Sequence, residues 1–226
     1  MNLIIDSRVI CRLINPGYVK VVGTMYDLTG IILSGGNNIR MGENKAFIEL
    51  DGRRIIDRTV ALFGEIFKQT ILVTNEPLDY ADLDLEIVVD LIPKSGSLIG
   101  IYTGLFYASY PHCFVAACDM PFIDKRVIDY IVTMKEQYDV VIPHLQDGYH
   151  PLFARYSNRC MGFIEKLMDD DKLKITNLFN KVKVREVLPK DVSLLDPSLK
   201  SFCNLNTPED LEKARALLKK GSGLHF

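Results

Sequence analysis

Short β-rich runs alternate with helical stretches from residue 28 to residue 143. The runs are apolar enough to be buried on both faces, and the stretches between them repeat apolar residues at helical spacing. This order is typical of βαβ crossovers, which build a mostly parallel sheet with helices on both faces. We therefore predict a single α/β domain with a Rossmann-like, three-layer sandwich architecture.

The positions of the elements follow from the same pattern. We expect strands at residues 28–34, 69–74, 86–90, 112–118 and 139–143, and helices at 54–67, 98–110 and 124–137. The second half is less regular, and we expect short helices at 161–168 and 172–180 and a strand at 181–187. Internal repeats and low-complexity linkers are absent from the sequence, which agrees with one domain.

Composition limits the classes of partner. The 226 residues are 48% hydrophobic and 25% charged, which is the composition of a globular protein. The formal net charge is −2, so the chain has no overall basic field for binding nucleic acid. No apolar run is long enough to span a membrane. These values favour a small anion, bound locally, as the ligand.

The five cysteines have neither disulfide nor zinc-site spacing. They are scattered and odd in number, and no Cys-x-x-Cys pair occurs, at Cys11, Cys113, Cys118, Cys160 and Cys203. Cys113 and Cys118 lie in or beside an apolar run, where a thiol packs as a small apolar group. We expect free thiols and a cytoplasmic protein.

The two ends differ from the rest. Charged and polar residues and Pro16 interrupt residues 1–24, so this segment does not read as a secretory signal peptide. We expect residues 1–24 to be an extension outside the core, residues 25–220 to form the domain, and residues 221–226 to be a tail.

The segment after the first expected strand carries the strongest functional signal. Residues 33–45 read Leu-Ser-Gly-Gly-Asn-Asn-Ile-Arg-Met-Gly-Glu-Asn-Lys. Gly35 and Gly36 allow a sharp turn and close approach to a ligand, and exposed N–H groups in such a loop bind phosphate oxygens. Arg40 and Lys45 add two cations. The spacing fits neither G-x-x-x-x-G-K-[ST] nor G-x-G-x-x-G. We predict a nucleotide phosphate site of another kind.

Polar residues end four expected strands. These are Ser34 to Gly36, Asn75, Asp90 and Asp119. Ligands of open α/β sheets bind beyond the carboxyl ends of the strands, so we expect these residues to meet at one edge. Asp119 follows an apolar strand and is placed to hold a hard cation such as Mg²⁺, although a turn aspartate explains the same pattern.

Several motifs together give a family resemblance. The segment 33–45 resembles the L-x-G-G-x-[SN]-x-R-M-G-x-x-K pattern of the nucleotidyltransferases related to molybdenum cofactor guanylyltransferase, the MobA-like family. Cys118-Asp119-Met120-Pro121-Phe122, residues 150–154 and the Asn-Leu-Asn-Thr-Pro-Glu-Asp-Leu ending at 204–211 resemble further motifs of that family. Residues 90–100 depart from its D-x-x-P-x-x-G-P-L-x-G pattern, since Ser97 stands where proline is usual. The resemblance runs from Met25 to about Lys219.

The resemblance implies a nucleotide-diphospho-sugar transferase-like fold and a set of roles. Catalysis would fall to Lys45, Asp119 and Arg40, and Asp119, assisted by Asp90 or Asn206, would hold Mg²⁺. His150, Asn204 and Asn206 would lie on the acceptor side. The nucleotide would bind to Leu33, Ser34, Gly35, Gly36, Lys45, Asn75, Asp90 and Asp119.

The implied reaction is transfer of GMP from GTP to the phosphate of molybdopterin, with release of pyrophosphate. The product would be the guanine dinucleotide form of the molybdenum cofactor. Related enzymes that use CTP tend to carry L-A-A-G where this chain has Leu33-Ser34-Gly35-Gly36, so Gly35 favours the larger base. The resemblance also implies transient contact with cofactor-supplying proteins or molybdoenzymes.

Three other classes stay open at this point. A CTP-using cytidylyltransferase of the molybdenum cofactor or a sugar-phosphate nucleotidyltransferase would share the fold and the first motif. A non-catalytic GTP-binding protein that delivers the cofactor would bind nucleotide and release no pyrophosphate. A Rossmann oxidoreductase is disfavoured, because the G-x-G-x-x-G pattern is missing.

Overall fold

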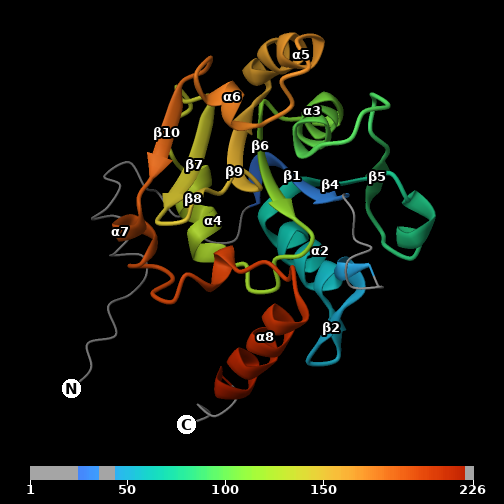
Figure 1. The fold of residues 1–226 in the computed structure, drawn as a ribbon, viewed down its shortest axis with the longest axis vertical. Coiled ribbons are helices and arrows are strands. Elements are labelled where there is room, and N and C mark those ends of the chain that lie inside the picture. The colour runs from blue at the N-terminus through green and yellow to red at the C-terminus, as the bar shows by residue number, and fades with distance from the viewer. Residues whose placement is uncertain (1–24, 36–43, 222–226) are drawn as a thin grey trace.

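The computed structural model describes residues 25–35 and 44–221. A sheet whose strand order is β10-β7-β9-β6-β1-β4-β5 runs through the molecule, with β8 paired to β7 (Figure 1). Six of the seven ordered strands run in one direction, and β9 is antiparallel to both of its neighbours. The strands are β1 (Tyr26–Ser34), β4 (Phe67–Thr74), β5 (Glu86–Val88), β6 (His112–Ala117), β7 (Val140–Leu145), β8 (Gly148–Tyr149), β9 (Phe153–Ser157) and β10 (Val184–Val187).

Helices cover the two faces of this sheet. One face packs against α2 (Ile55–Ile66) and α4 (Lys125–Val132), and the other packs against α3 (Ser97–Tyr107) and α5 (Met161–Asp169). Alternate residues of β1 enter the cores on the two faces. Ile32 joins the core on the side of α2 and α4, and Ile31 and Leu33 join the core on the side of α3 and α5. Because successive strand residues point to opposite faces, the continuous apolar run of β1 requires both layers. The expected α/β three-layer sandwich with a mostly parallel sheet is confirmed.

The expected elements are present, with altered bounds at several ends. The helix expected to reach residue 137 ends at Val132, where buried Arg155 donates to the carbonyls of Val132, Met134 and Lys135. Strand β5 ends at Val88, and the helix expected at 172–180 is the short α6 (Thr176–Phe179). The antiparallel strand β9 and the hairpin of β2 (Glu49–Leu50) and β3 (Arg53–Arg54) were not expected.

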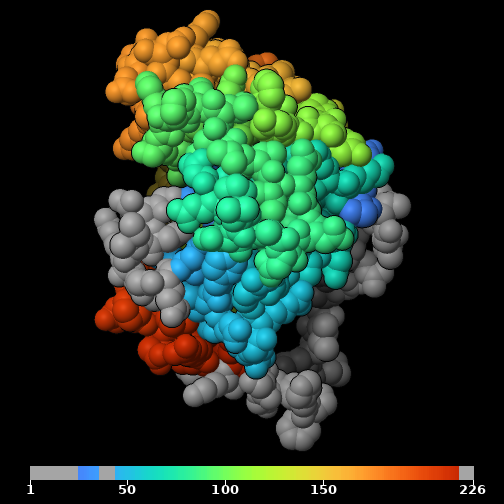
Figure 2. Space-filling view, turned by 90° about the vertical axis from the view of Figure 1, so that its right-hand side faces the viewer, coloured from blue at the N-terminus to red at the C-terminus, as the bar shows by residue number. Residues whose placement is uncertain are grey.

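The last helix packs away from the main sheet. Leu205 and Ala214 of the α8 region (α8 is Pro208–Gly221) share a small core with Ile48, Leu50 and Ile55. Figures 1 and 2 both show α8 beside the β2–β3 hairpin. Gly221, the first residue of the expected tail, belongs to α8. Residues 1–24, the expected extension, lie outside the described residues. None of the helices in the described part of the chain is long and apolar enough to cross a bilayer.

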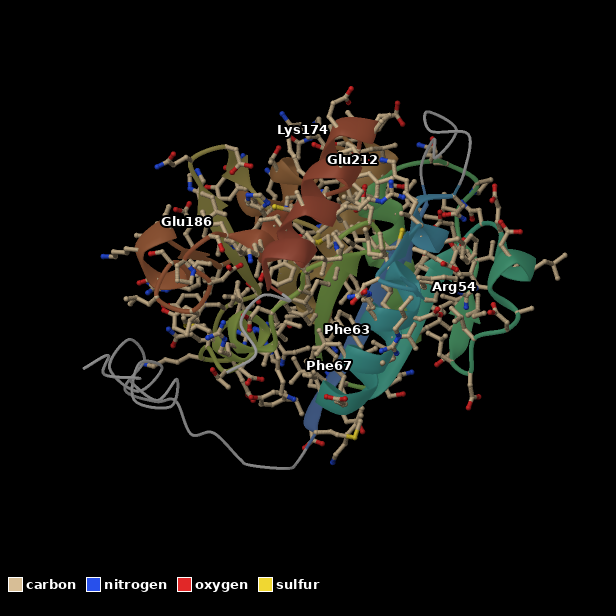
Figure 3. All side chains as sticks on the ribbon, turned by 90° about the horizontal axis from the view of Figure 1, so that it is seen from below. Arg54, Phe63, Phe67, Lys174, Glu186 and Glu212 are labelled. Carbon is tan, nitrogen blue, oxygen red and sulfur yellow. The ribbon has the colours of Figure 1, made fainter. Side chains whose placement is uncertain are left out.

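Two glycines let the layers approach closely. A Cβ on Gly30 of β1 would lie 2.5 Å from ring atoms of Phe63 and of Phe67, which are labelled beside β1 and α2 in Figure 3. A Cβ on Gly104, in the middle of α3, would lie 2.7 Å from two side-chain atoms of Ile31. The distance between α3 and the sheet therefore depends on the missing side chain at residue 104.

We expect Gly104→Ala to lower the free energy of unfolding by about 1–3 kcal/mol, because the new methyl group would overlap Ile31, which is fully buried in the core. Gly64→Ala is the matched control, since Gly64 is an exposed helical glycine whose Cβ would meet nothing within 4 Å. The free energy of unfolding of this control should rise by about 0.5–1 kcal/mol, because alanine has the higher helix propensity. Urea denaturation of both variants measures the difference, and equal stability of the two would contradict the packing argument.

Candidate active site

A cavity of about 340 Å³ lies beyond the carboxyl ends of β1, β4 and β6. The segment between β5 and α3 lines it with Asp90, Ser95 and Gly96, the start of α3 adds Ser97, and the C-terminal segment adds Asn204 and Asn206. The strands deliver the residues that follow or end their apolar runs, as expected for ligand sites of open α/β sheets. The expected residues that line the cavity are Leu33, Ser34, Gly35, Asn75, Asp90, Asp119, Asn204 and Asn206.

The glycine segment is only partly described. Gly35 lines the cavity, and a Cβ built on it would meet no described atom within 4 Å. Gly36 and Arg40, which were expected to bind phosphates, lie outside the described residues. The described residues begin again at Asn44, directly before Lys45.

Lys45 lies beside two residues that the sequence separates widely. Its Nζ is 3.8 Å from Asp119 Oδ2 and donates to Asn206 Oδ1 at 2.9 Å. The side chains of Lys45 and Asp119 are only 11% and 17% exposed, so water screens their attraction weakly. The structure thus brings three of the expected site residues into one cluster.

Local structure explains the position of Lys45. It begins the short 3₁₀ helix η2 (Lys45–Phe47), and Asn44 caps that helix by accepting a hydrogen bond from Ala46 N at 3.1 Å. An asparagine in this position satisfies a backbone donor that the helix leaves unpaired. The cap therefore sets where the lysine side chain leaves the backbone.

The carboxylate of Asp119 is poorly satisfied by the described residues. Its Oδ1 is buried and has no hydrogen-bond partner there. Burial raises the pKa of Asp119, and the nearby Lys45 ammonium opposes that shift. A buried carboxylate that has a lysine beside Oδ2 and leaves Oδ1 without a partner among the described residues fits a site for a hard cation or a polyphosphate.

A metal at this position would need ligands from outside the protein. Among the described residues, no group of three or more His, Cys, Asp or Glu side chains is placed to hold a metal ion. Mg²⁺ accepts such a site, because it commonly binds one or two carboxylates together with phosphate oxygens and water. Asp119 therefore fits a Mg²⁺ ion that arrives with a nucleotide.

The C-terminal segment is tied to the site at several points. The backbone N–H of Leu205 donates to the carbonyl of Asp119 at 3.0 Å, and Leu205 itself is buried. Asp210 Oδ2 accepts from the backbone N–H groups of Asn206 and Thr207, and Asp210 N donates to Thr207 Oγ1. This capping arrangement at the start of α8 holds the Asn206 amide beside Lys45.

Asn75 and Asp90 form a second, separate pair. Asn75 Nδ2 donates to Asp90 Oδ2 at 2.9 Å, and Asp90 N donates to Asn75 Oδ1 at 3.3 Å. Thr103 Oγ1 also donates to Asp90 Oδ1 at 3.4 Å. Of the two residues expected to assist Asp119, Asn206 hydrogen-bonds Lys45 in the cluster, whereas Asp90 hydrogen-bonds Asn75.

His150 lies in a neighbouring cavity. This second cavity, of about 420 Å³, also contains Phe122, Phe202 and Lys213, and it shares Asn204 and Asn206 with the first. The His150 ring packs against Phe202 with 4.9 Å between centroids. The two cavities therefore meet at the pair of asparagines expected on the acceptor side.

Some residues of the site were not anticipated from the sequence. Asn44 and Gly96 both occur inside motifs that the sequence displays, so their positions could have been found there. Gly96 has φ = 147°, a backbone conformation that favours glycine, at the turn into α3. Ser97 is the first residue of α3, a position that also tolerates the usual proline because its N–H needs no helical partner.

Comparisons with known proteins define the class. The structure matches molybdopterin-guanine dinucleotide biosynthesis protein A from Archaeoglobus fulgidus with a TM-score of 0.76 and 27% identity, over 85% of this chain and all of that one. It also matches 2-C-methyl-D-erythritol 4-phosphate cytidylyltransferase from Thermus thermophilus, with a TM-score of 0.64 and 15% identity over 86% of this chain and all of that one. The second likeness shows the fold alone. The chain has the fold of the nucleotidyltransferases of the nucleotide-diphospho-sugar transferase type.

The family is narrower than the fold. Residues 30–184 match the MobA-like NTP transferase domain. The molybdenum cofactor guanylyltransferase of Desulfosudis oleivorans is 41% identical over 196 residues, which are 86% of this chain and 97% of that protein. This chain belongs to the MobA-like NTP transferase family.

The raised pKa of Asp119 predicts an effect on stability. The Asp119 carboxyl group holds its proton more tightly in the folded chain than in the unfolded chain. Above the folded-state pKa, ionisation of Asp119 therefore destabilises the fold. Without metal or nucleotide, we expect Asp119→Asn to raise the free energy of unfolding by about 1 kcal/mol at about pH 7.5. The gain should shrink as the pH falls through the folded-state pKa, where the wild-type carboxyl becomes neutral.

Thermal unfolding in metal-free buffer over a pH series measures this effect. Asp170→Asn is the control, because Asp170 is exposed and Lys172 holds its pKa below the ordinary value. That control should give no gain. A melting midpoint of Asp119→Asn below that of the wild type at neutral pH would contradict the interpretation.

Proposed function

We propose that this protein transfers GMP from GTP to the terminal phosphate of molybdopterin and releases pyrophosphate, in a Mg²⁺-dependent reaction. The contact of Lys45 with both Asp119 and Asn206, at the edge of a cavity formed by strand ends, is the structural observation that carries this proposal. Membership of the MobA-like family and the 41% identical guanylyltransferase support the choice of substrates.

The chemistry assigns a role to each group. An oxygen of the acceptor phosphate attacks the α-phosphorus of GTP, and the bond to the oxygen that bridges to the β-phosphorus breaks. The acceptor is already an anion, so the step needs no protein base. Lys45 would stabilise negative charge at the α-phosphate, as positioned cations do in phosphoryl and nucleotidyl transfer.

The other residues would bind and orient the substrates. Asp119 would hold Mg²⁺ with the Asn206 amide beside it, and the bound ion would offset phosphate charge. Gly35, with Gly36 and Arg40 beyond it, would bind the β- and γ-phosphates, and Asn75 and Asp90 would contact the nucleoside. His150, Asn204 and Asn206 would face the acceptor, since His150 lines the cavity that adjoins the first at the two asparagines.

The proposal includes the setting of the reaction. The described cysteines, Cys113, Cys118, Cys160 and Cys203, are free thiols, which supports a reducing cytoplasm. The cofactor would reach and leave the site through transient contacts with cofactor-supplying proteins and molybdoenzymes.

The central experiment is calorimetric titration with GTP, CTP, ATP and UTP, each with Mg²⁺, followed by pyrophosphate release in the presence of molybdopterin. We expect GTP to bind most tightly, and chelation of Mg²⁺ to abolish turnover. Lys45→Ala should lower kcat by about 10²–10³-fold, the cost of removing one stabiliser of transition-state charge. Asp119→Ala should lower both affinity for GTP–Mg²⁺ and turnover.

Matched controls come from an exposed ion pair. Lys172→Ala and Asp170→Ala remove a lysine and an aspartate that contact each other at 2.9 Å on the surface, and neither should change affinity or turnover. Preference for CTP would assign a cytidylyltransferase instead. Tight GTP binding without pyrophosphate release would favour a cofactor-delivery protein. Turnover with a sugar phosphate as acceptor would instead identify a sugar-phosphate nucleotidyltransferase.

Base preference gives a separate prediction at Gly35. The fold tolerates a Cβ there, since no described atom lies within 4 Å of it, and the methyl group would occupy cavity space. We expect Gly35→Ala to weaken binding of GTP more than that of CTP, because the purine needs more room beside the backbone. Calorimetry with both nucleotides measures the ratio of the two affinities. An unchanged ratio would contradict the role given to Gly35.

A further inference from the structure

The hydroxyl of Tyr80 joins two segments that flank the glycine-containing stretch. Tyr80 ends the 3₁₀ helix η3 (Pro77–Tyr80) after β4, and its side chain is fully buried. Its hydroxyl hydrogen-bonds the Ser34 hydroxyl and accepts from Asn44 Nδ2 at 3.0 Å. Ser34 ends β1 and lines the cavity, whereas Asn44 directly precedes Lys45. One phenol oxygen thus connects the end of β1 with the start of η2.

The donors and acceptors of this group form a consistent chain. Because the Tyr80 oxygen accepts from Asn44, its own proton is available for Ser34. The segment that carries Ser34 is joined to that of Asp119 through the backbone, since the N–H of Cys118, the residue before Asp119, donates to the carbonyl of Leu33 at 3.0 Å. Burial raises the pKa of Tyr80, which keeps the phenol protonated and able to donate. This series of hydrogen bonds therefore extends from Asn44, the cap of η2, to Cys118, the neighbour of Asp119.

Asn44 is held at both ends of its amide. Its Nδ2 donates to Tyr80, and its Oδ1 accepts from Ala46 N, so the amide cannot rotate without losing a bond. The Tyr80 ring also packs against Phe47, with 4.9 Å between ring centroids. Tyr80 thus holds the short helix η2 by its hydroxyl and by its ring. A 3₁₀ helix of three residues has little stability of its own, so these outside contacts set its position.

We infer that Tyr80 is a positioning residue for nucleotidyl transfer: through Asn44 and Ser34, its hydroxyl holds Lys45 against Asp119 at the edge of the cavity. The role is not catalytic, because Tyr80 is fully buried and does not line the cavity. This inference rests on the proposed function for its kinetic consequence, whereas its structural half is independent of any substrate.

The structural half is tested by amide hydrogen exchange in Tyr80→Phe, which keeps the ring on Phe47 and removes only the oxygen. We expect the Ala46 amide, which Asn44 caps, to exchange about tenfold faster than in the wild type. Tyr26→Phe is the matched control, because Tyr26 donates to Asp129 Oδ1 at 3.2 Å near the other end of β1. Exchange at Ala46 should be unchanged in that control, and unchanged exchange in Tyr80→Phe would overturn the inference.

The kinetic half is tested by a double-mutant cycle with Lys45→Ala, read as pyrophosphate release from GTP. Tyr80→Phe alone should lower kcat by about 10–100-fold with a smaller change in KM, as expected when a charged group is misplaced. In the Lys45→Ala background, Tyr80→Phe should lower kcat by less than about a further twofold, since the group that Tyr80 positions is already gone. Tyr26→Phe should leave kcat unchanged.

The outcomes separate this inference from the proposed function. Additive effects in the cycle, or a kcat of Tyr80→Phe within about twofold of the wild type, would show a purely structural tyrosine and overturn the inference. A wild-type chain that releases no pyrophosphate would contradict the proposed function. In that case Ala46 exchange still decides whether Tyr80 holds η2, and faster exchange supports that half alone.

Discussion

The close approach of Lys45 and Asp119 is the interaction on which the candidate site depends. Their charged atoms are 3.8 Å apart, and both side chains are largely shielded from water. The attraction does not fully offset the burial of the carboxylate, since the pKa of Asp119 is still raised. A fold that keeps a poorly solvated carboxylate, with one oxygen that has no partner among the described residues, carries a cost that a bound cation would remove.

Three parts of the chain hold this pair in place. Asp119 follows β6 in the middle of the sheet, Lys45 begins η2, and Asn206 precedes α8. The small core that joins the β2–β3 hairpin to Leu205 and α8 brings the last two parts together. Packing at a distance from the cavity therefore sets distances inside it, as expected for close-packed interiors.

The alternation of apolar runs was enough to predict the sheet, its layers and the edge where Gly35, Asn75, Asp90 and Asp119 meet. It was not enough to predict the strand β9 or its direction. A strand buried on both faces has the same apolar pattern whether its neighbours run parallel or antiparallel, so only pairing decides. The early end of α4 could not be predicted either, because it depends on a residue distant in the sequence. The carbonyls at that end accept hydrogen bonds from Arg155.

The sequence by itself determined the fold class, the family motifs and the list of polar residues at strand ends, because these depend on local spacing and on residue type. Which of the polar residues touch was decided by the tertiary structure: the amide oxygen of Asn206 accepts a hydrogen bond from Lys45, whereas Asp90 pairs with Asn75. Tyr80 shows the difference most clearly. Nothing near it in the sequence marks it, and its contacts with Ser34 and Asn44 exist only because the sheet brings together segments 46 and 36 residues away.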